Sequence, residues 1–454
     1  MATTPAATAN KYNFFRGHPS VSLLPSKEIL QATTTIFTNV INDENYYDDA
    51  YNRHPLQYGP DLGNLEVRQT IAKWNDVNFK LSTPTNVKCI NMTNGASYGI
   101  MNILTRTTSP HNNLTRRAFL VTPTYHLMNT VFIDAGFGEK LTGIEELADG
   151  QIDLDSLKQQ LEYYDSLEPI KFTITYDDIK SIQSPIKPLK KIYRYVFYVV
   201  PTFSNPRGGT LSLETKKQLI ELARAHDMLI ISDDVYDLLD YTCVQEEQPE
   251  YSKRLVYIDR ETLTDQDGYG NTVSNCTFSK LVGPGLRVGW QETPTPSLTQ
   301  VIDKGGAHIS GGSPSHTNSM VISELINSGS LKDVIFRLRS EYRKRSNVLL
   351  NSIKEFLPRG TQITGGHGGY FVWVTLPDGY DCRQICQTCA ERGVLLANGD
   401  NFEVVGDLRG WGRSSVRLSL SFLPCDLIAE GIKIWGDVCQ QSQQCQHQHK
   451  ELTT

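Results

Sequence analysis

The middle of the chain alternates short, wholly apolar runs with a segment of helical periodicity. The runs Tyr195–Val200 and Met228–Ser232 flank Thr215–Asp227, where apolar residues recur at spacings of three and four. A third run, Ala118–Val121, is followed by threonine and proline. Strands that are apolar on both faces are typical of parallel sheets covered by helices on both sides. The pattern therefore predicts an α/β fold with a large, mostly parallel sheet domain.

The last third of the chain has a different pattern. Arg337–Phe356 is a long, charged, amphipathic stretch, and Gly369–Pro377 and Ser415–Phe422 resemble strands. This mixture predicts a smaller α+β domain. We expect the large domain to span residues 51–325, and the small domain to combine residues 11–50 with 326–445.

Some polar segments are expected to lie outside this core. Residues 1–10 and 446–454 are predicted to be flexible tails. The stretches Tyr163–Lys191 and Thr242–Asn275 are predicted to be loop insertions that hold no recognisable chemistry.

Composition excludes several classes of protein. The chain has 44 Lys and Arg against 50 Asp and Glu, a net charge of −6, which disfavours a nucleic-acid partner. No apolar run approaches the length of about 20 residues that spans a membrane, so no membrane partner is expected. The first 15 residues lack the apolar core of a secretory signal, and the chain is therefore expected in the cytoplasm.

The nine cysteines are odd in number and scattered, which disfavours a secreted disulfide framework. Cys386 and Cys389 form a C-x-x-C motif, and Cys382 lies four residues earlier. This spacing is typical of one face of a helix. No second pair or nearby histidine supports zinc, so we expect no metal site.

Two motifs carry reactive groups. Asp233 and Tyr236 directly follow a predicted buried strand, where ligands bind in open parallel sheets, although an acidic helix N-terminus is an alternative interpretation. The segment Thr277–Trp290 contains Lys280 among hydroxyl groups and an arginine. A lysine flanked by apolar residues can act as a nucleophilic amine, and the other groups suit a phosphate.

Other residues strengthen these motifs only in combination. Gly95, Ala96 and Ser97 are small residues at an apparent helix start, where free N–H groups bind anions. Tyr125 and Asn205 each follow the end of a strand, although an exposed turn is the more ordinary explanation for an Asn-Pro pair taken alone. Arg417 lies within an apolar strand, where a charge needs an anionic ligand or a structural salt bridge.

Together these residues meet the requirements of pyridoxal 5'-phosphate. The cofactor needs an amine for covalent attachment, a carboxylate at its pyridine nitrogen and donors for its phosphate. On this ordered set of motifs, from about Asn13 to about Trp435, the chain resembles the class I/II aminotransferases, which have the fold type I architecture. Within that family it is similar to the fungal branch related to 2-aminoadipate and kynurenine aminotransferases.

The resemblance assigns a role to each motif. It makes Lys280 the cofactor-binding lysine, Asp233 the acid at the pyridine nitrogen, and Tyr236 and Asn205 the donors to the phenolic oxygen. Tyr125 would stack on the ring. The resemblance also implies that the phosphate is held by Ala96, Ser97, Thr277, Ser279 and Arg287, with Tyr58 supplied by the neighbouring subunit of a homodimer.

The resemblance also identifies a substrate site. It assigns Arg417 to the α-carboxylate of the substrate and Gly17 to the mouth of the site. Next to Gly17, Arg16 is predicted to contact the distal carboxylate of a dicarboxylic substrate. The chain departs from the family at Arg207, in the Asn-Pro-Arg-Gly segment, and at Asn398-Gly399, and both departures leave side-chain specificity open.

The implied reaction is ping-pong transfer of an amino group from an L-amino acid to 2-oxoglutarate. The donors 2-aminoadipate, aromatic amino acids and kynurenine all remain open. A β-lyase of the C–S lyase type uses the same residues and is the main alternative. A non-catalytic regulator of this fold is a further alternative, although only about a dozen residues precede the predicted fold, too few for a DNA-binding domain.

Overall fold

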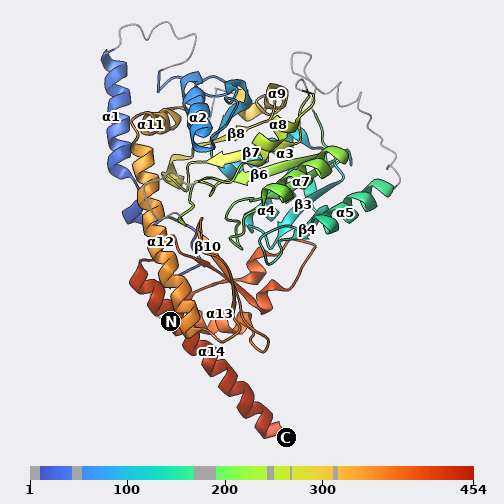
Figure 1. Cartoon of the computed structure of the whole chain (residues 1–454), viewed down its shortest axis with the longest axis vertical. Helices are drawn as coiled ribbons and strands as arrows, with labels where there is room; N and C mark the ends of the chain where they lie inside the picture. The colour runs from blue at the N-terminus through green and yellow to red at the C-terminus, as the bar shows by residue number, and fades with distance from the viewer. Residues whose placement is uncertain are drawn as a thin grey trace, which may run out of the picture.

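A computed structural model of the chain describes residues 11–42, 54–167, 191–242, 250–265, 268–309 and 315–453. Its largest layer is a seven-stranded sheet with the order β2-β8-β7-β6-β5-β3-β4 (Figure 1). All neighbouring strands are parallel except β8, which is antiparallel to both of its neighbours. The strands are β2 (Ile90–Thr93), β3 (Arg117–Thr122), β4 (Leu141–Glu145), β5 (Tyr195–Val199), β6 (Met228–Asp234), β7 (Thr272–Thr277) and β8 (Gly289–Glu292).

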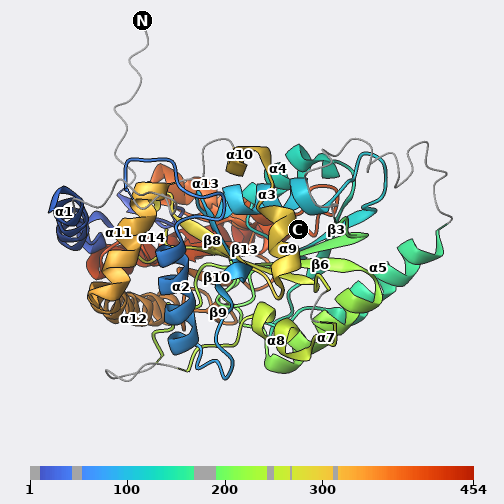
Figure 2. The same cartoon turned by 90° about the horizontal axis from the view of Figure 1, so that it is seen from above.

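Helices cover both faces of this sheet (Figure 2). Helices α3 and α4 lie on one side, and α5, α7 and α8 lie on the other. The helices of this part of the chain are α2 (Leu65–Asn78), α3 (Ala96–Thr107), α4 (Leu127–Phe132), α5 (Leu154–Ser166), α7 (Leu213–Ala225), α8 (Leu255–Thr262), α9 (Pro296–Ile302), α10 (Gly306–Ile309) and α11 (His316–Asn327). The mostly parallel α/β architecture predicted from the sequence is therefore confirmed.

The apolar runs form strands because both of their faces are buried. In β5, Val196 and Tyr198 belong to the core under α3, whereas Phe197 belongs to the core under α5 and α7. All three side chains are at most 1% exposed. The adjoining helix α7 is capped by Ser212, the residue before its start, whose hydroxyl accepts a hydrogen bond from the amide of Thr215.

A second, antiparallel sheet has the order β12-β13-β10-β9, and a short parallel pair joins β1 to β11. Helix α12 packs along α14, which extends away from the body towards the C-terminus (Figure 1). The elements are β1 (Tyr12–Asn13), α1 (Ser26–Asn42), α12 (Ser330–Phe356), β9 (Gln362–Gly365), β10 (Phe371–Thr375), α13 (Cys382–Glu391), β11 (Val394–Leu395), β12 (Ala397–Asn398), β13 (Ser415–Ser419) and α14 (Cys425–Thr453).

The smaller α+β unit is thus present, with two differences from the sequence-based expectation. Helix α12 begins at Ser330, seven residues before the predicted start, because Leu331, Val334 and Ile335 extend its buried face. Helix α14 continues through residues 446–453, for which the sequence predicts a flexible tail. The proposed domain boundaries at residues 50 and 325 stay a prediction.

The prediction that Thr242–Asn275 is a loop insertion is wrong for much of that stretch. It contains helix α8 and most of β7, an interior strand that lies between β8 and the central strand β6. The sequence does not indicate this strand because it carries small polar residues, Ser274 and Asn275. In the structure both residues are fully buried and hydrogen-bonded to acidic side chains of β6. The other predicted insertion begins with the last turn of α5, and its residues 168–190 lie outside the described residues.

The C-x-x-C motif lies in helix α13, as predicted, with Cys382 and Cys389 buried. Within the described part of the chain, no group of three or more His, Cys, Asp or Glu side chains is placed to hold a metal ion. Among the described helices, none combines the length and apolar character that crossing a membrane requires.

Candidate active site

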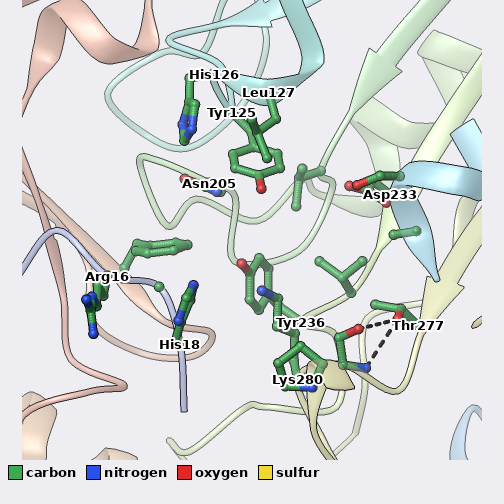
Figure 3. A pocket seen from close by; sticks show the side chains of 18 of the residues that line it. Arg16, His18, Tyr125, His126, Leu127, Asn205, Asp233, Tyr236, Thr277 and Lys280 are labelled. Carbon is green, nitrogen blue, oxygen red and sulfur yellow. Dashed lines mark hydrogen bonds between the residues drawn. The ribbon is translucent and has the colours of Figure 1, made fainter. Parts of the chain in front are cut away.

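One cavity of about 580 Å³ lies where the carboxyl ends of the large-sheet strands meet the smaller unit. In Figure 3, Asp233 and Thr277 lie on one side and Arg16 and His18 on the opposite side, with Tyr236 and Lys280 between them. Every predicted site residue except Tyr58 lines this cavity: Arg16, Gly17, Ala96, Ser97, Tyr125, Asn205, Asp233, Tyr236, Thr277, Ser279, Lys280, Arg287 and Arg417.

Asp233 is the second-last residue of strand β6 and receives two hydrogen bonds. The hydroxyl of Tyr198 donates to Oδ2 at 2.9 Å, and the side-chain amide of Asn275 donates to Oδ1 at 2.8 Å. Burial raises the pKa of Asp233 to about 6, while both donors and the charge of Lys280 oppose the rise. The carboxylate is therefore ionised at neutral pH and oriented by fixed donors.

Lys280 follows β7, and its Nζ lies 5.7 Å from the ring centre of Tyr236 and 5.3 Å from that of Tyr370. The Tyr370 hydroxyl donates to the carbonyl of Lys280, which fixes the backbone there. Burial, helped by the charges of Arg417 and Arg287 and opposed by the attraction of Asp233, lowers the pKa of Lys280 to about 8. A substantial unprotonated fraction near neutral pH makes this amine a competent nucleophile and base.

The Tyr236 side chain is buried, and burial together with Tyr125 raises the pKa of its phenol, so it remains a hydrogen-bond donor. Tyr125 lies above it in Figure 3 and packs edge-on against His126, with ring centres 5.2 Å apart. These aromatic groups line the cavity between Asp233 and the strand of Arg417.

An anion-binding corner forms at the start of helix α3. The N-cap residue Gly95 has a φ of +87°, and no side chain caps the helix, so the first amides of Ala96 and Ser97 are available to a ligand. The guanidinium of Arg287 packs against Gly95, where a Cβ would collide with it. A glycine is required at this position for both reasons.

Two hydroxyl groups complete this corner. Thr277 Oγ1 and Ser279 Oγ lie 2.9 Å apart, and the amide of Ser279 donates to Thr277 Oγ1 (Figure 3). Amides at a helix start, two hydroxyls and a guanidinium together are the donor set that a phosphate group requires.

Arg417 is a buried cation that forms no ion pair with an acidic side chain within the described residues. Its Nη atoms donate to Oδ1 of Asn205 at 3.2 Å and to the carbonyl of Phe15 at 2.5 Å, and its guanidinium lies 4.1 Å from the ring centre of Phe371. Its buried Nε has no hydrogen-bond partner within the described residues. Burial lowers the pKa of Arg417 to about 10. A carboxylate ligand would supply the missing charge and acceptor.

The segment of Arg16, Gly17 and His18 forms the opposite wall. The guanidinium of Arg16 is exposed and lies 5.6 Å from the ring centre of Phe422. Burial, Lys280 and Arg16 all lower the pKa of His18. A Cβ added to Gly17 would lie 2.6 Å from Cζ of Phe371, so this glycine allows the segment to approach the floor of the site.

The two departures from the family pattern lie outside this cavity. Arg207 donates to the carbonyl of Glu146, and its guanidinium lies 5.8 Å from the ring centre of Trp411. Asn398 donates to the carbonyl of Gly412. Both residues hold loops together and are not among the residues that line the cavity.

Tyr58 lies apart from the cavity. It is 76% exposed and lines a separate surface groove with Leu56 and residues 315–318. Within a single subunit, therefore, Tyr58 does not join the other predicted residues.

Sequence reasoning missed four residues that line the cavity or hold Asp233. A tyrosine inside an apolar strand needs a partner for its hydroxyl, which could have drawn attention to Tyr198. His18 and His126 adjoin residues already singled out. Asn275 gave no signal, because its segment was interpreted as a loop.

Pyridoxal phosphate fits this arrangement. The uncapped start of α3 offers a phosphate site, Lys280 offers an amine with a lowered pKa, and Asp233 offers an oriented carboxylate. The Nε–H group of Arg417, which has no partner within the described residues, can donate a hydrogen bond to a substrate carboxylate.

Comparisons with known proteins agree with this geometry. The model of the family described as aminotransferase class I and II matches residues 24–421. The chain is 48% identical over 435 residues to the uncharacterized protein YER152C of Saccharomyces cerevisiae, covering 94% of this chain and 96% of the relative. It is 28% identical over 252 residues to the 2-aminoadipate transaminase of Thermus thermophilus, covering 55% of this chain and 58% of that enzyme.

Among solved structures, the kynurenine aminotransferase of Pyrococcus horikoshii has a TM-score of 0.73 and 25% sequence identity. The superposition covers 96% of this chain and 92% of that one. That enzyme was solved in complex with PMP.

Proposed function

Because the chain belongs to the class I and II aminotransferases, we propose that it transfers the amino group of an L-amino acid to 2-oxoglutarate in a ping-pong cycle with pyridoxal phosphate. The observation that supports this most directly is the meeting of Lys280, Asp233 and Arg417 in one cavity. An amine, an acid and a carboxylate-binding cation are the three groups that the reaction needs around its substrate.

When bound, pyridoxal phosphate withdraws electrons from the substrate Cα and so makes its proton acidic. Asp233 would pair with the pyridine nitrogen and keep it protonated. Asn205 and Tyr236 would donate hydrogen bonds to the phenolic oxygen, and Tyr125 would pack on the ring. Ala96, Ser97, Thr277, Ser279 and Arg287 would hold the phosphate.

The chain's own residues then orient the substrate and move its proton. Arg417 would bind the α-carboxylate through the planar fork of its guanidinium, which fixes the direction of the Cα–H bond. Lys280, whose pKa is lowered to about 8, would remove the proton from Cα. The phenylalanine rings that surround Arg417 exclude water and strengthen its attraction for the carboxylate.

The donor is proposed to be 2-aminoadipate or an aromatic amino acid. An exposed guanidinium at Arg16 suits a distal carboxylate, and the Thermus relative is named a 2-aminoadipate transaminase. The P. horikoshii enzyme, a kynurenine aminotransferase, supports an aromatic donor. An Arg16→Ala variant with an unchanged KM for 2-oxoglutarate would remove the role proposed for Arg16.

We also propose that two copies of the chain share their active sites. Tyr58 and Leu56 are 76% and 70% exposed, and Leu30 and Ile41 of α1 are 68% and 82% exposed. Exposed apolar residues of this kind support an interface with a second copy, from which Tyr58 would reach the phosphate of its partner. The cytoplasm stays the predicted compartment.

The first test is an absorbance titration of the purified protein with 2-aminoadipate alone. We expect a cofactor band that shifts on addition of the donor, with one 2-oxo acid released for each site. A band that does not shift would reject this donor and require a screen of others. Release of pyruvate and ammonia from a cysteine conjugate, without any 2-oxo acid present, would favour the β-lyase alternative.

A further inference from the structure

Asn275 connects two parts of the site that the sequence does not relate. It is fully buried in β7 and lies directly opposite Asp233 of β6 in the sheet register. Its Nδ2 donates to Oδ1 of Asp233 at 2.8 Å and also to the carbonyl of Ala96 at 3.1 Å. A single amide group therefore joins the acid of β6 to the first residue of helix α3.

The orientation of this amide is dictated by its surroundings. Both neighbours are hydrogen-bond acceptors, so only the nitrogen can face them. The oxygen, Oδ1, is buried without a partner within the described residues, and it packs so closely on Gly99 that a Cβ there would overlap it. Burying this oxygen without a partner costs free energy. The two hydrogen bonds that the nitrogen donates are therefore the interactions that keep an asparagine at this position.

The donor acts on the charge of Asp233. Burial raises the pKa of this carboxyl group to about 6, and the hydrogen bonds from Asn275 and Tyr198, together with the charge of Lys280, limit the rise. A donor of this kind stabilises the ionised form. Without Asn275, the pKa of Asp233 is expected to rise further.

We propose that Asn275 is a positioning residue that keeps Asp233 ionised and directed at the cofactor nitrogen, and that fixes this acid relative to the phosphate-binding start of α3. The inference rests on the role proposed above for Asp233. Cofactor binding, measured without turnover, depends directly on the ionisation of Asp233.

The test measures the dissociation constant of pyridoxal phosphate from cofactor-free protein, by absorbance titration, at pH 6 and pH 8. The variant Asn275→Leu removes the donor and keeps the branched shape of the side chain, and Asn275→Ala removes it without adding bulk, in case the leucine variant does not fold. If the pKa of Asp233 rises by about one, the dissociation constant should increase about fivefold at pH 6 and stay nearly unchanged at pH 8. Dividing the dissociation constant of the variant by that of the parent removes the effect of every other group that titrates in both proteins.

Asn91→Leu is the matched control. Asn91 is also fully buried in this sheet, donates one side-chain hydrogen bond, to Gln291, and leaves its oxygen unpartnered within the described residues. The side-chain donors to Asp233 in the described part of the chain are Tyr198 and Asn275 and not Asn91, so the Asn91 variant should show the same ratio at both pH values. Urea unfolding of each cofactor-free protein checks that the variants are folded.

Several outcomes would overturn the inference. A loss of affinity in the Asn275 variants that does not depend on pH would make Asn275 merely structural, as would an equal pH dependence in Asn91→Leu. The variant Asp233→Ala tests the role of Asp233 separately from the role of Asn275. If that variant binds the cofactor as tightly as the parent, the role of Asp233 itself fails, whereas if only the Asn275 variants are without effect, the present inference alone fails.

Discussion

Replacing Arg417 by methionine tests whether this buried arginine binds the α-carboxylate of the substrate. Arg417 is 3% exposed and stacks on Phe371, and methionine can fill a similar volume there. The replacement removes the positive charge and the Nε–H group, which has no partner within the described residues. Arg417→Lys is the matched variant, because it keeps the charge and loses only the planar fork.

The hydrogen bonds available to Arg417 set the magnitude of the effect. Each hydrogen bond between charged groups contributes about 1.5–3 kcal/mol, so two bonds to a carboxylate contribute about 3–6 kcal/mol. We therefore expect kcat/KM of Arg417→Met to fall roughly 10²- to 10⁴-fold. Arg417→Lys, which keeps one charged hydrogen bond, should lose about 10- to 100-fold.

The assay compares two amino donors in the half-reaction, which is followed by the absorbance of the cofactor. One donor is 2-aminoadipate, and the other is 5-aminopentanoate, which lacks the α-carboxylate. Parent and Arg417→Met should react at similar, slow rates with 5-aminopentanoate, because neither can bind a group that the donor lacks. An equal loss of rate with both donors would refute the reasoning, since Arg417 would then act on something other than the α-carboxylate.

Three further predictions follow from other parts of the structure. The pKa of Asp233 rises from 3.8 to about 6 on burial, so its carboxylate costs the cofactor-free fold about 3 kcal/mol above pH 6 and almost nothing below pH 4. Asp233→Asn should accordingly raise the free energy of unfolding in urea at pH 8 but not at pH 4, and an equal gain at both would contradict this. Gly17→Ala places a Cβ 2.6 Å from Cζ of Phe371 and should raise KM about tenfold with little change in Tm; an unchanged KM would show that this wall can yield. Tyr58→Ala should weaken pyridoxal phosphate binding about tenfold and leave the unfolding midpoint of the subunit unchanged, as measured by titration of the cofactor-free protein; unaltered affinity would exclude Tyr58 from a shared site.

Much of the site could be predicted because its residues follow strands whose apolar character is unambiguous. Tyr195–Val200 and Met228–Ser232 cannot be exposed, so the polar groups that come next, Asn205 and Asp233, must lie at a common edge of the sheet. Lys280 was recognised from the hydroxyl groups beside it. These inferences depend on local sequence alone, and the structure brings these residues together in one cavity.

The prediction failed where burial depends on partners that are distant in the sequence. Strand β7 carries Thr, Ser and Asn residues, which are typical of a loop, yet it is an interior strand of the sheet. Its polar side chains tolerate burial because Asp233 and Asp234 of the adjacent strand accept their hydrogen bonds. No local pattern reports such a pairing, because it exists only once β6 and β7 are side by side.

The α/β class, the strand ends and the reactive side chains therefore follow from the sequence, since hydrophobic periodicity and side-chain chemistry are local properties. Tertiary structure alone decided the ionisation of those side chains. The lowered pKa of Lys280 and the raised pKa of Asp233 arise from burial and from neighbours such as Arg417 and Asn275, and only the folded chain brings these groups close to one another.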